Sequence, residues 1–302
     1  MSSFSARALR GMVKMFGSLP LGFHYAVGDF LSWFAKNIMK YRADVVMVNL
    51  SRAFPQMKYK DLKKIYDRFY RHFGEIIAET IWYGASDYKR LDKARIVTVE
   101  NPDILNLALA SSPSVTMLYS HLGNWEIIGG VCSYKTDDGR LMNISEESVR
   151  VVYKKLSSKV SDEFFALNRI APLEREGTST EVETSNILRY VLKHKDEKML
   201  YIYIADQYPY YGSSPYDVGM FLNQPTKGML GSLAAAHKLG HAVVYMNMRR
   251  EERGHYRLIF TKLCEDASKV EPGVLIRKYF DLLEKDISEC PENWLWSHKR
   301  WK

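Results

Sequence analysis

The chain has 302 residues and is 46% hydrophobic, so it can bury a full core, most simply in one large α/β domain. Its formal net charge of +8 and its pI of about 9.1 favour anionic partners: phosphate-bearing lipids, membrane surfaces, nucleic acid or an acidic protein. No recognisable nucleic-acid motif accompanies the basic residues, and the three cysteines are too scattered to suggest a disulfide framework or a zinc site, so we expect neither nucleic acid nor a metal.

The first 40 residues form the candidate membrane-associating segment. Residues 19–39 are mostly apolar or aromatic, and basic residues flank them on both sides. A spanning helix needs about 20 predominantly apolar residues, and polar residues interrupt this run, so it is a marginal candidate. A helix lying in the membrane interface fits the composition better, and a core helix of a soluble protein is the alternative. We expect residues 1–40 to hold the protein at a membrane without being needed for the activity of residues 41–302.

Beyond this segment, helical and strand-like patterns alternate. Apolar residues recur at helical spacing from Leu62 to Thr80, and basic residues fill the other face, which predicts a long amphipathic helix. Apolar, β-rich runs follow at 114–120, 150–154, 199–205, 242–248 and 256–261. Helical patterns lie near 124–136, 157–168, 182–193 and 228–239, and a last one lies at 271–288. The alternation predicts an α/β fold, with a central sheet, crossover connections and flanking helices.

The most informative motif joins a histidine to a carboxylate. His121 follows the apolar run 115–119, and Glu126 comes after four intervening residues. Five helical steps would put the two side chains roughly 140° apart, so they cannot meet on one continuous helix. We therefore place His121 in the loop between strand and helix, where Gly123 makes the turn. Asn124 then caps the helix, and Glu126 reaches back from its first turn.

This arrangement predicts a general base with an orienting acid. The His121 imidazole would take a proton from a hydroxyl while Glu126 fixes its tautomer. The alternative is a satisfied loop histidine beside an ordinary first-turn glutamate. No Gly-x-Ser-x-Gly elbow or paired Cys and His stands out, so direct attack of the acceptor on a thioester is the most economical mechanism. Backbone N–H groups near Gly123 are candidates for stabilising the oxyanion.

Other polar residues can converge on the same place. Active sites of α/β sheets lie beyond the carboxyl ends of strands, and His121, Lys154 and Asp206 each follow a predicted strand. Asp206, with Gln207 beside it, is expected to hold the backbone of the site or a basic residue. A turn aspartate bonded to its own loop is the alternative.

Segment 119–126 resembles the His-x4-Asp/Glu signature of the bacterial lipid A biosynthesis (lauroyl/myristoyl) acyltransferase family, within the lysophospholipid acyltransferase group. Further segments resemble elements of this family, in order along nearly the whole chain: 49–55, 151–154, 205–207, 221–225, 233–236 and 291–301. The resemblance implies a glycerolipid acyltransferase-like fold. That fold has a central mixed sheet flanked by helices, an N-terminal membrane-associating helix and, over residues 41–302, an acyltransferase domain.

The resemblance further implies a membrane-associated O-acyltransferase without a cofactor. A fatty acyl chain would move from acyl–acyl carrier protein to a hydroxyl of a lipid A precursor, at the cytoplasmic face of the bacterial inner membrane. The basic charge balance fits both an acidic carrier protein and a phosphorylated glycolipid. The alternatives are the same mechanism acting on a lysophospholipid, a glycolipid or an amino-acid lipid, and a catalytically silent membrane-binding protein on this fold.

The resemblance also adds candidate binding residues. Lys154 stands where the family usually has arginine and would bind a phosphate or the acyl donor, with a surface lysine as the alternative. Arg169 approximates a family arginine. We therefore expect catalysis from His121 and Glu126. The expected substrate-binding residues are Gly123, Asn124, Lys154, Arg169, Asp206 and Gln207.

Overall fold

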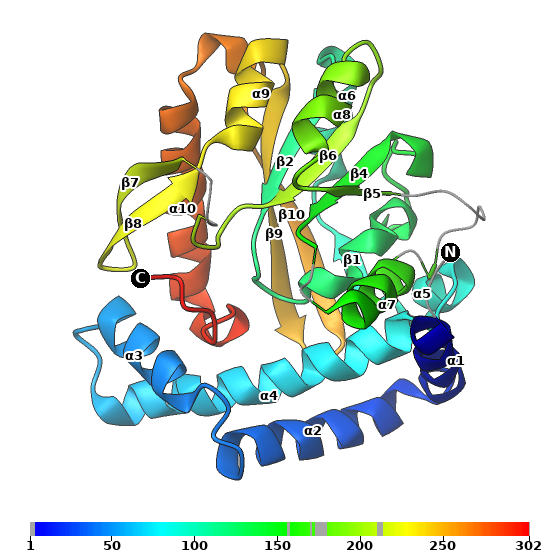
Figure 1. Cartoon of the computed structure of the whole chain (residues 1–302), viewed down its shortest axis with the longest axis vertical. Helices are drawn as coiled ribbons and strands as arrows, with labels where there is room; N and C mark the ends of the chain where they lie inside the picture. Colours follow the sequence, from blue (N-terminus) through cyan, green and yellow to red (C-terminus); the bar gives the residue numbers. More distant parts are fainter. Residues whose placement is uncertain (1–3, 156–157, 170, 173–179, 210–213, 302) are drawn as a thin grey trace.

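The computed structural model describes residues 4–155, 158–169, 171–172, 180–209 and 214–301. At its centre is an eight-stranded mixed sheet in the order β3-β1-β10-β9-β2-β6-β4-β5, with a separate hairpin beside it (Figure 1). The sheet strands are β1 (Val97–Val99), β2 (Val115–Tyr119), β3 (Lys135–Thr136), β4 (Val149–Tyr153), β5 (Glu181–Glu183), β6 (Leu200–Ile204), β9 (Ala242–Glu252) and β10 (His255–Cys264). The hairpin is β7 (Pro215–Phe221) and β8 (Gln224–Met229). The predicted central mixed sheet is confirmed.

Strand direction determines where the site lies. β2 is parallel to β9 on one side and to β6 on the other, and β6 is parallel to β4. β10 is antiparallel to β9. All five residues of β2 are buried, as expected for a parallel strand covered on both faces. Because parallel strands end at the same edge, the residues after β2, β4 and β6 share one carboxyl edge, which faces α4 (Tyr59–Tyr83) (Figure 1).

Helices cover both faces of the sheet. α9 (Gly231–Leu239) and α10 (Pro272–Glu289) pack in one hydrophobic core, and α6 (Pro102–Ser111) and the 3-10 helix η1 (Trp125–Ser133) pack in the other. Neighbouring residues of β2 divide between them, since Leu118 belongs to the first core and Met117 to the second. The other helical segments are α3 (Ala43–Ala53), α5 (Tyr88–Ala94), α7 (Lys159–Arg169), α8 (Ile187–Lys193), η2 (Glu146–Ser148), η3 (Ala267–Lys269) and η4 (Pro291–Asn293).

A layer of N-terminal helices lies below the carboxyl edge (Figure 1). α4 is the predicted amphipathic helix, and α1 (Phe4–Gly17) and α2 (Leu21–Asn37) pack against it. Gly28 of α2 and Gly74 of α4 let the two backbones approach closely. A Cβ at Gly28 would lie only 2.4 Å from the Gly74 carbonyl oxygen. α2 is therefore packed tightly on the rest of the protein.

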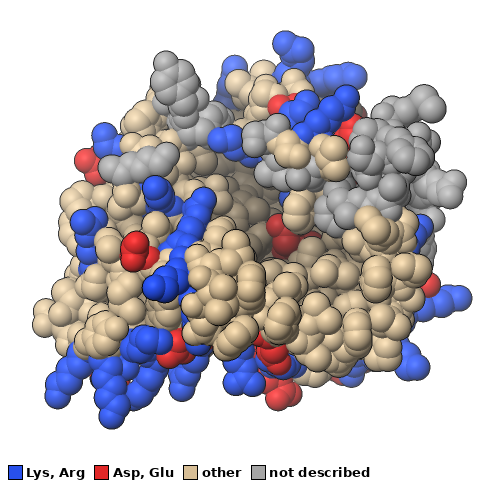
Figure 2. All heavy atoms as spheres, turned by 60° about the horizontal axis from the view of Figure 1, so that its bottom comes forward, with Lys and Arg blue, Asp and Glu red and all other residues tan. Residues whose placement is uncertain are grey.

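The outward surface of α1 and α2 is rich in exposed apolar side chains: Met12, Met15, Phe16, Phe23, Val27, Phe30, Leu31, Trp33, Phe34, Ile38 and Met39. Figure 2 shows a broad uncharged area on this side of the molecule, bordered by basic side chains. Within the described residues, every helix is too short or too polar to cross a membrane. The helix predicted at 19–39 is present as α2, and its association with a membrane stays a prediction.

Three predicted helices differ from the structure. Region 124–136 forms η1, a 3-10 helix, and region 182–193 divides into β5 and α8. The helix predicted at 228–239 begins only after β8. The sequence patterns do not indicate the β7–β8 hairpin, because its turn places Leu222 and Asn223 at positive φ (49° and 58°), and leucine gives no turn signal.

Candidate active site

The His121 imidazole is held by Asp206 at the carboxyl edge of the sheet. His121 follows β2, and Asp206 follows the adjacent strand β6. Nδ1 of His121 lies 2.8 Å from Oδ1 of Asp206, and the His121 backbone N–H donates to Oδ2 at 3.0 Å. The indole N–H of Trp294 donates to the same Oδ2 at 2.8 Å. Since His121 is 8% exposed and Asp206 is 2% exposed, the pair is enclosed in the protein with a fixed orientation.

The surroundings of Asp206 favour its ionised form. Burial alone would raise the pKa of this carboxyl, but the His121 imidazole, the His121 N–H and the Trp294 indole hold the pKa below its usual value. The carboxylate accepts the Nδ1 proton, and this bond assigns the tautomer that keeps a lone pair on Nε2. The side-chain amide nitrogen of Gln207 lies 3.0 Å from that Nε2.

Glu126 belongs to a neighbouring charged cluster. Its carboxylate accepts a hydrogen bond from the adjacent tryptophan indole at 3.0 Å and lies 3.5 Å from Nε of Arg169. Arg169 also contacts Glu181, with its Nη1 at 3.0 Å from the carboxylate. The structure thus corrects the predicted contact between Glu126 and His121, because the carboxylate that holds the imidazole is Asp206.

The ring of Trp125 explains this difference. It packs on the His121 ring, with centroids 5.0 Å apart, so the first turn of η1 presents an indole to the imidazole. The next side chain, Glu126, turns to Arg169. One of its carboxylate oxygens has no hydrogen-bond partner among the described residues. That oxygen, Oε2, is buried and is the one that lies 3.5 Å from Nε of Arg169.

Gly123 and Asn124 form the predicted turn and cap. Gly123 has φ +72°, and a Cβ there would lie 2.3 Å from the Met248 carbonyl oxygen, so glycine is required. Oδ1 of Asn124 accepts the Glu126 N–H at 3.2 Å, which caps η1. The Gly123 N–H donates to the Asn293 carbonyl at 3.0 Å, so it is not available to an oxyanion. The Asn124 side chain is fully buried, so the geometry favours support of the loop over contact with substrate.

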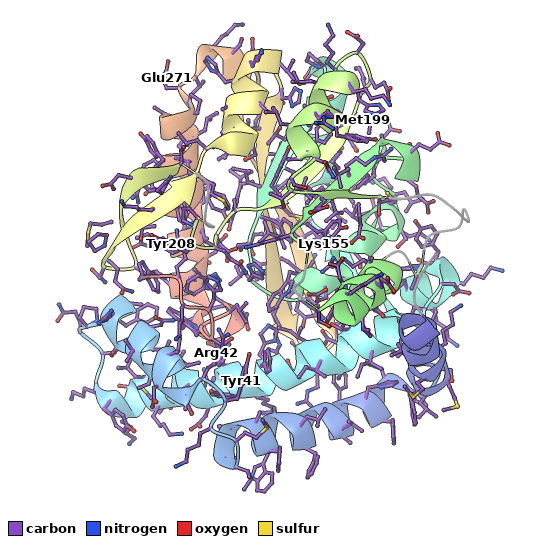
Figure 3. The ribbon with its side chains drawn as sticks, viewed as in Figure 1. Tyr41, Arg42, Lys155, Met199, Tyr208 and Glu271 are labelled. Atoms are coloured by element: carbon purple, nitrogen blue, oxygen red, sulfur yellow. The ribbon has the colours of Figure 1, made fainter. Side chains whose placement is uncertain are left out.

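Lys154 follows β4 at the same carboxyl edge and is exposed. Lys155, labelled in Figure 3, comes next in the chain. Figure 2 shows that this side of the molecule is hollowed near its centre, with acidic atoms inside the hollow. The structure therefore brings His121, Asp206 and Gln207 together and leaves Lys154 at the exposed edge.

Within the described residues, no three His, Cys, Asp or Glu side chains gather so that they could hold a metal ion.

Sequence reasoning missed the part played by Trp294. This residue lies in the segment 291–301, whose likeness to a family element was the available signal. The segment returns to the carboxyl edge of the sheet, where Leu122 and Trp294 form a β-bridge.

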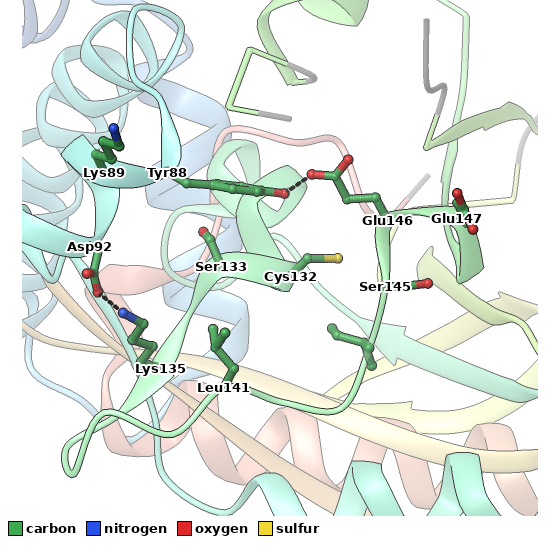
Figure 4. A pocket seen from close by; sticks show the side chains of 11 residues that line it. Tyr88, Lys89, Asp92, Cys132, Ser133, Lys135, Leu141, Ser145, Glu146 and Glu147 are labelled. Atoms are coloured by element: carbon green, nitrogen blue, oxygen red, sulfur yellow. Dashed lines mark hydrogen bonds and ion pairs between the residues drawn. The ribbon is translucent and has the colours of Figure 1, made fainter. Parts of the chain in front are cut away.

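A separate pocket lies at the other end of η1 (Figure 4). Its wall includes an ion pair between Lys135 and Asp92 and a hydrogen bond from Tyr88 to Glu146. Its lining residues include Cys132, whose thiol pKa burial raises to about 12, so this cysteine stays protonated and is a poor nucleophile. The residues described as lining it include neither His121 nor its partners.

An imidazole held by a carboxylate at the carboxyl edge of an α/β sheet can serve as a general base. Residues 6–302, nearly the whole chain, match the family model of the bacterial lipid A biosynthesis acyltransferases. The chain therefore belongs to this family and is an acyltransferase, as the motifs predict. No match is found among curated proteins.

Proposed function

We propose that the protein transfers a fatty acyl chain from acyl–acyl carrier protein to a hydroxyl of a lipid A precursor, at the cytoplasmic face of the bacterial inner membrane. Family membership supports acyl transfer of the lipid A type. The observation that carries the mechanism is the His121–Asp206 pair, which leaves Nε2 as the basic nitrogen beside Gln207.

His121 acts as the general base. Nε2 removes the proton of the acceptor hydroxyl, and the resulting oxygen attacks the thioester carbonyl. The tetrahedral intermediate then collapses, the C–S bond breaks, and the imidazolium returns its proton to the departing thiolate. Asp206 stabilises the imidazolium through Nδ1 and does not itself take the proton.

The neighbouring residues bind the acceptor. Glu126 and Arg169, whose Oε2 and Nε lie 3.5 Å apart, would line the acceptor site as an ion pair. Because Arg169 already lies between two carboxylates, it is a weak phosphate site. Lys154, exposed at the carboxyl edge, is the candidate for a phosphate of acceptor or donor.

A lipid acceptor also explains the exposed apolar surface of α1 and α2. These side chains would lie at the lipid interface, and the basic residues around them would attract anionic headgroups. Such a peripheral attachment would bring the hollowed side of the molecule to the membrane (Figure 2).

The test is transfer of labelled acyl chains from acyl–acyl carrier protein to a purified lipid A precursor. His121→Ala is expected to lower turnover on the order of 10²–10⁴-fold with an unchanged circular dichroism spectrum. A folded variant that keeps more than about a tenth of the wild-type turnover would exclude His121 as the base.

A deletion strain identifies the acceptor. Loss of one acyl chain from lipid A supports the proposal. Unchanged lipid A together with a missing phospholipid, glycolipid or aminolipid would contradict it and assign the same chemistry to another acceptor.

A further inference from the structure

A buried carboxylate on α4 holds the loop that carries His121. Glu79 is fully buried, and its two oxygens accept three hydrogen bonds. The Asn124 amide donates to Oε2 at 2.7 Å, and the Tyr256 hydroxyl donates to the same oxygen at 2.8 Å. The Tyr25 hydroxyl donates to Oε1 at 2.9 Å. Glu79 therefore connects the loop, the sheet and α2.

Asn124 links this carboxylate to the catalytic base. It lies three residues after His121, and its Oδ1 caps η1 while its amide is bonded to Glu79. The preceding carbonyl, that of Gly123, accepts a hydrogen bond from Nε2 of His72 at 3.2 Å. Since His72 also belongs to α4, two side chains of this helix fix two consecutive residues of the loop.

The partners of Glu79 differ from those of its neighbour on the helix. Glu75, one turn earlier, is joined to Arg250 and Arg253, and these contacts, with His72, hold its pKa at about 2 against its own burial. Glu79 accepts instead from an amide and two phenols, and burial raises its pKa. Because Glu75 already attaches α4 to the β9–β10 hairpin, the distinct contribution of Glu79 is its bond to the loop.

We propose that Glu79 is a positioning residue for acyl transfer, because it holds the Asn124 amide and thereby keeps His121 where Nε2 reaches the acceptor hydroxyl. The proposal rests on His121 being the general base. A displacement of about 1 Å at a reacting group can lower a rate about 100-fold. Orientation acts mainly in the transition state, so losing the Glu79 contact should lower kcat and leave the KM for the acceptor nearly unchanged.

Exchanging the donor and the acceptor tests the contact between Asn124 and Glu79. Asn124→Asp sets two carboxylates face to face, and adding Glu79→Gln restores a donor–acceptor pair of opposite polarity. We expect Asn124→Asp to lower kcat at least about tenfold, with the acceptor KM within about twofold. The double variant should recover kcat to within about threefold of the wild type.

Asp286→Asn is the matched control, because Asp286 also accepts a tyrosine hydroxyl, that of Tyr245, but lies on α10. Its kcat should stay within about twofold of the wild type. Thermal unfolding of each variant separates loss of fold from loss of position.

A folded Asn124→Asp variant with wild-type kcat would overturn the proposal, and so would a folded double variant that does not recover. If Asn124→Asp does not fold, Asn124→Ser takes its place, since serine still caps η1 but is too short to reach Glu79. The same fall in kcat is then expected, and an unchanged kcat refutes the contact. His121→Ala is measured in parallel. An active His121→Ala refutes the base, whereas an inactive one beside fully active Asn124 variants refutes only the positioning role.

Discussion

Asp206 determines which nitrogen of His121 carries the proton, so replacing its carboxylate should affect the chemistry more than binding. Asp206→Asn keeps the size of the side chain but lets an amide donate to Nδ1, which favours the unproductive tautomer. We expect kcat to fall on the order of 10²–10⁴-fold while the acceptor KM stays within about twofold. Steady-state kinetics with saturating donor measure both values. A folded variant with near wild-type kcat would show that Asp206 does not orient the base.

Glu126 should behave differently, because its contacts are with Arg169 and not with the imidazole. Glu126→Gln removes the charge that balances Arg169 and would disturb the part of the acceptor site that this ion pair lines. We expect kcat/KM for the acceptor to fall at least about tenfold, with a rise in KM as part of the loss. Arg169→Lys, which keeps the charge but loses the fork of donors, should show a similar rise in KM. A loss confined to kcat would instead place Glu126 in the chemical step.

The place of His121 at a strand end could be predicted from the sequence, and so could a holding role for Asp206 at the same edge, but the contact between His121 and Asp206 could not. His121 follows a strongly apolar run and precedes a glycine, and these local signals placed it in a strand-to-helix loop. Its contact with Asp206 joins residues 85 positions apart and exists because β2 and β6 are neighbours in the sheet. A local pattern does not contain strand order, so the nearest carboxylate in sequence, Glu126, was the natural but incorrect partner for the contact.

Among the elements, the packing of α2 on α4 leaves no room for an added side chain at Gly28. An added Cβ at Gly28 would meet the Gly74 backbone, whereas one at Gly22, on the same helix, has no atom within 4 Å. Gly28→Ala should therefore separate the helices and destabilise the protein by about 1–3 kcal/mol. Gly22→Ala should be neutral or slightly stabilising, because alanine favours a helix. Thermal unfolding compares the pair, and equal melting temperatures would contradict the close packing.

The elements that could be predicted are those with a strong period. The five apolar runs all became strands, and the long helix from Leu62 to Thr80 lies within α4. Short elements such as β1 and β3 have too few residues to show a hydrophobic period.

The expectation that residues 1–40 are separable from the activity remains untested, but the structure gives a reason to doubt it. Tyr25 of α2 donates to Glu79, which in turn holds the His121 loop.

At the scale of the whole molecule, α3 and the C-terminal segment meet beside the site. Asn49 of α3 donates to the Trp296 carbonyl at 2.8 Å, and two residues earlier Trp294 donates to Asp206. A site assembled from α4, β2, β6 and the C-terminal segment needs nearly the full chain. This agrees with a family match that extends over residues 6–302.

The whole-molecule surface also predicts how the protein meets its lipid. Phe30 and Trp33 are 61% and 52% exposed on α2, so changing them should alter membrane affinity without altering stability. We expect the double variant Phe30→Ser with Trp33→Ser to lose most of its binding to phosphatidylglycerol vesicles in a sedimentation assay. Leu107→Ser is the matched control, because Leu107 is 68% exposed on α6, which Figure 1 shows at the opposite end of the molecule from α2.

Salt separates the two contributions to this binding. Each basic residue near an anionic surface contributes about 1 kcal/mol to membrane binding. Raising the ionic strength screens this attraction, so it should weaken the binding of the wild-type protein to the vesicles. Wild-type sedimentation that resists both salt and carbonate extraction would contradict a peripheral attachment through α2. Vesicle binding that is equal in the double variant and the control would place the lipid contact on another face.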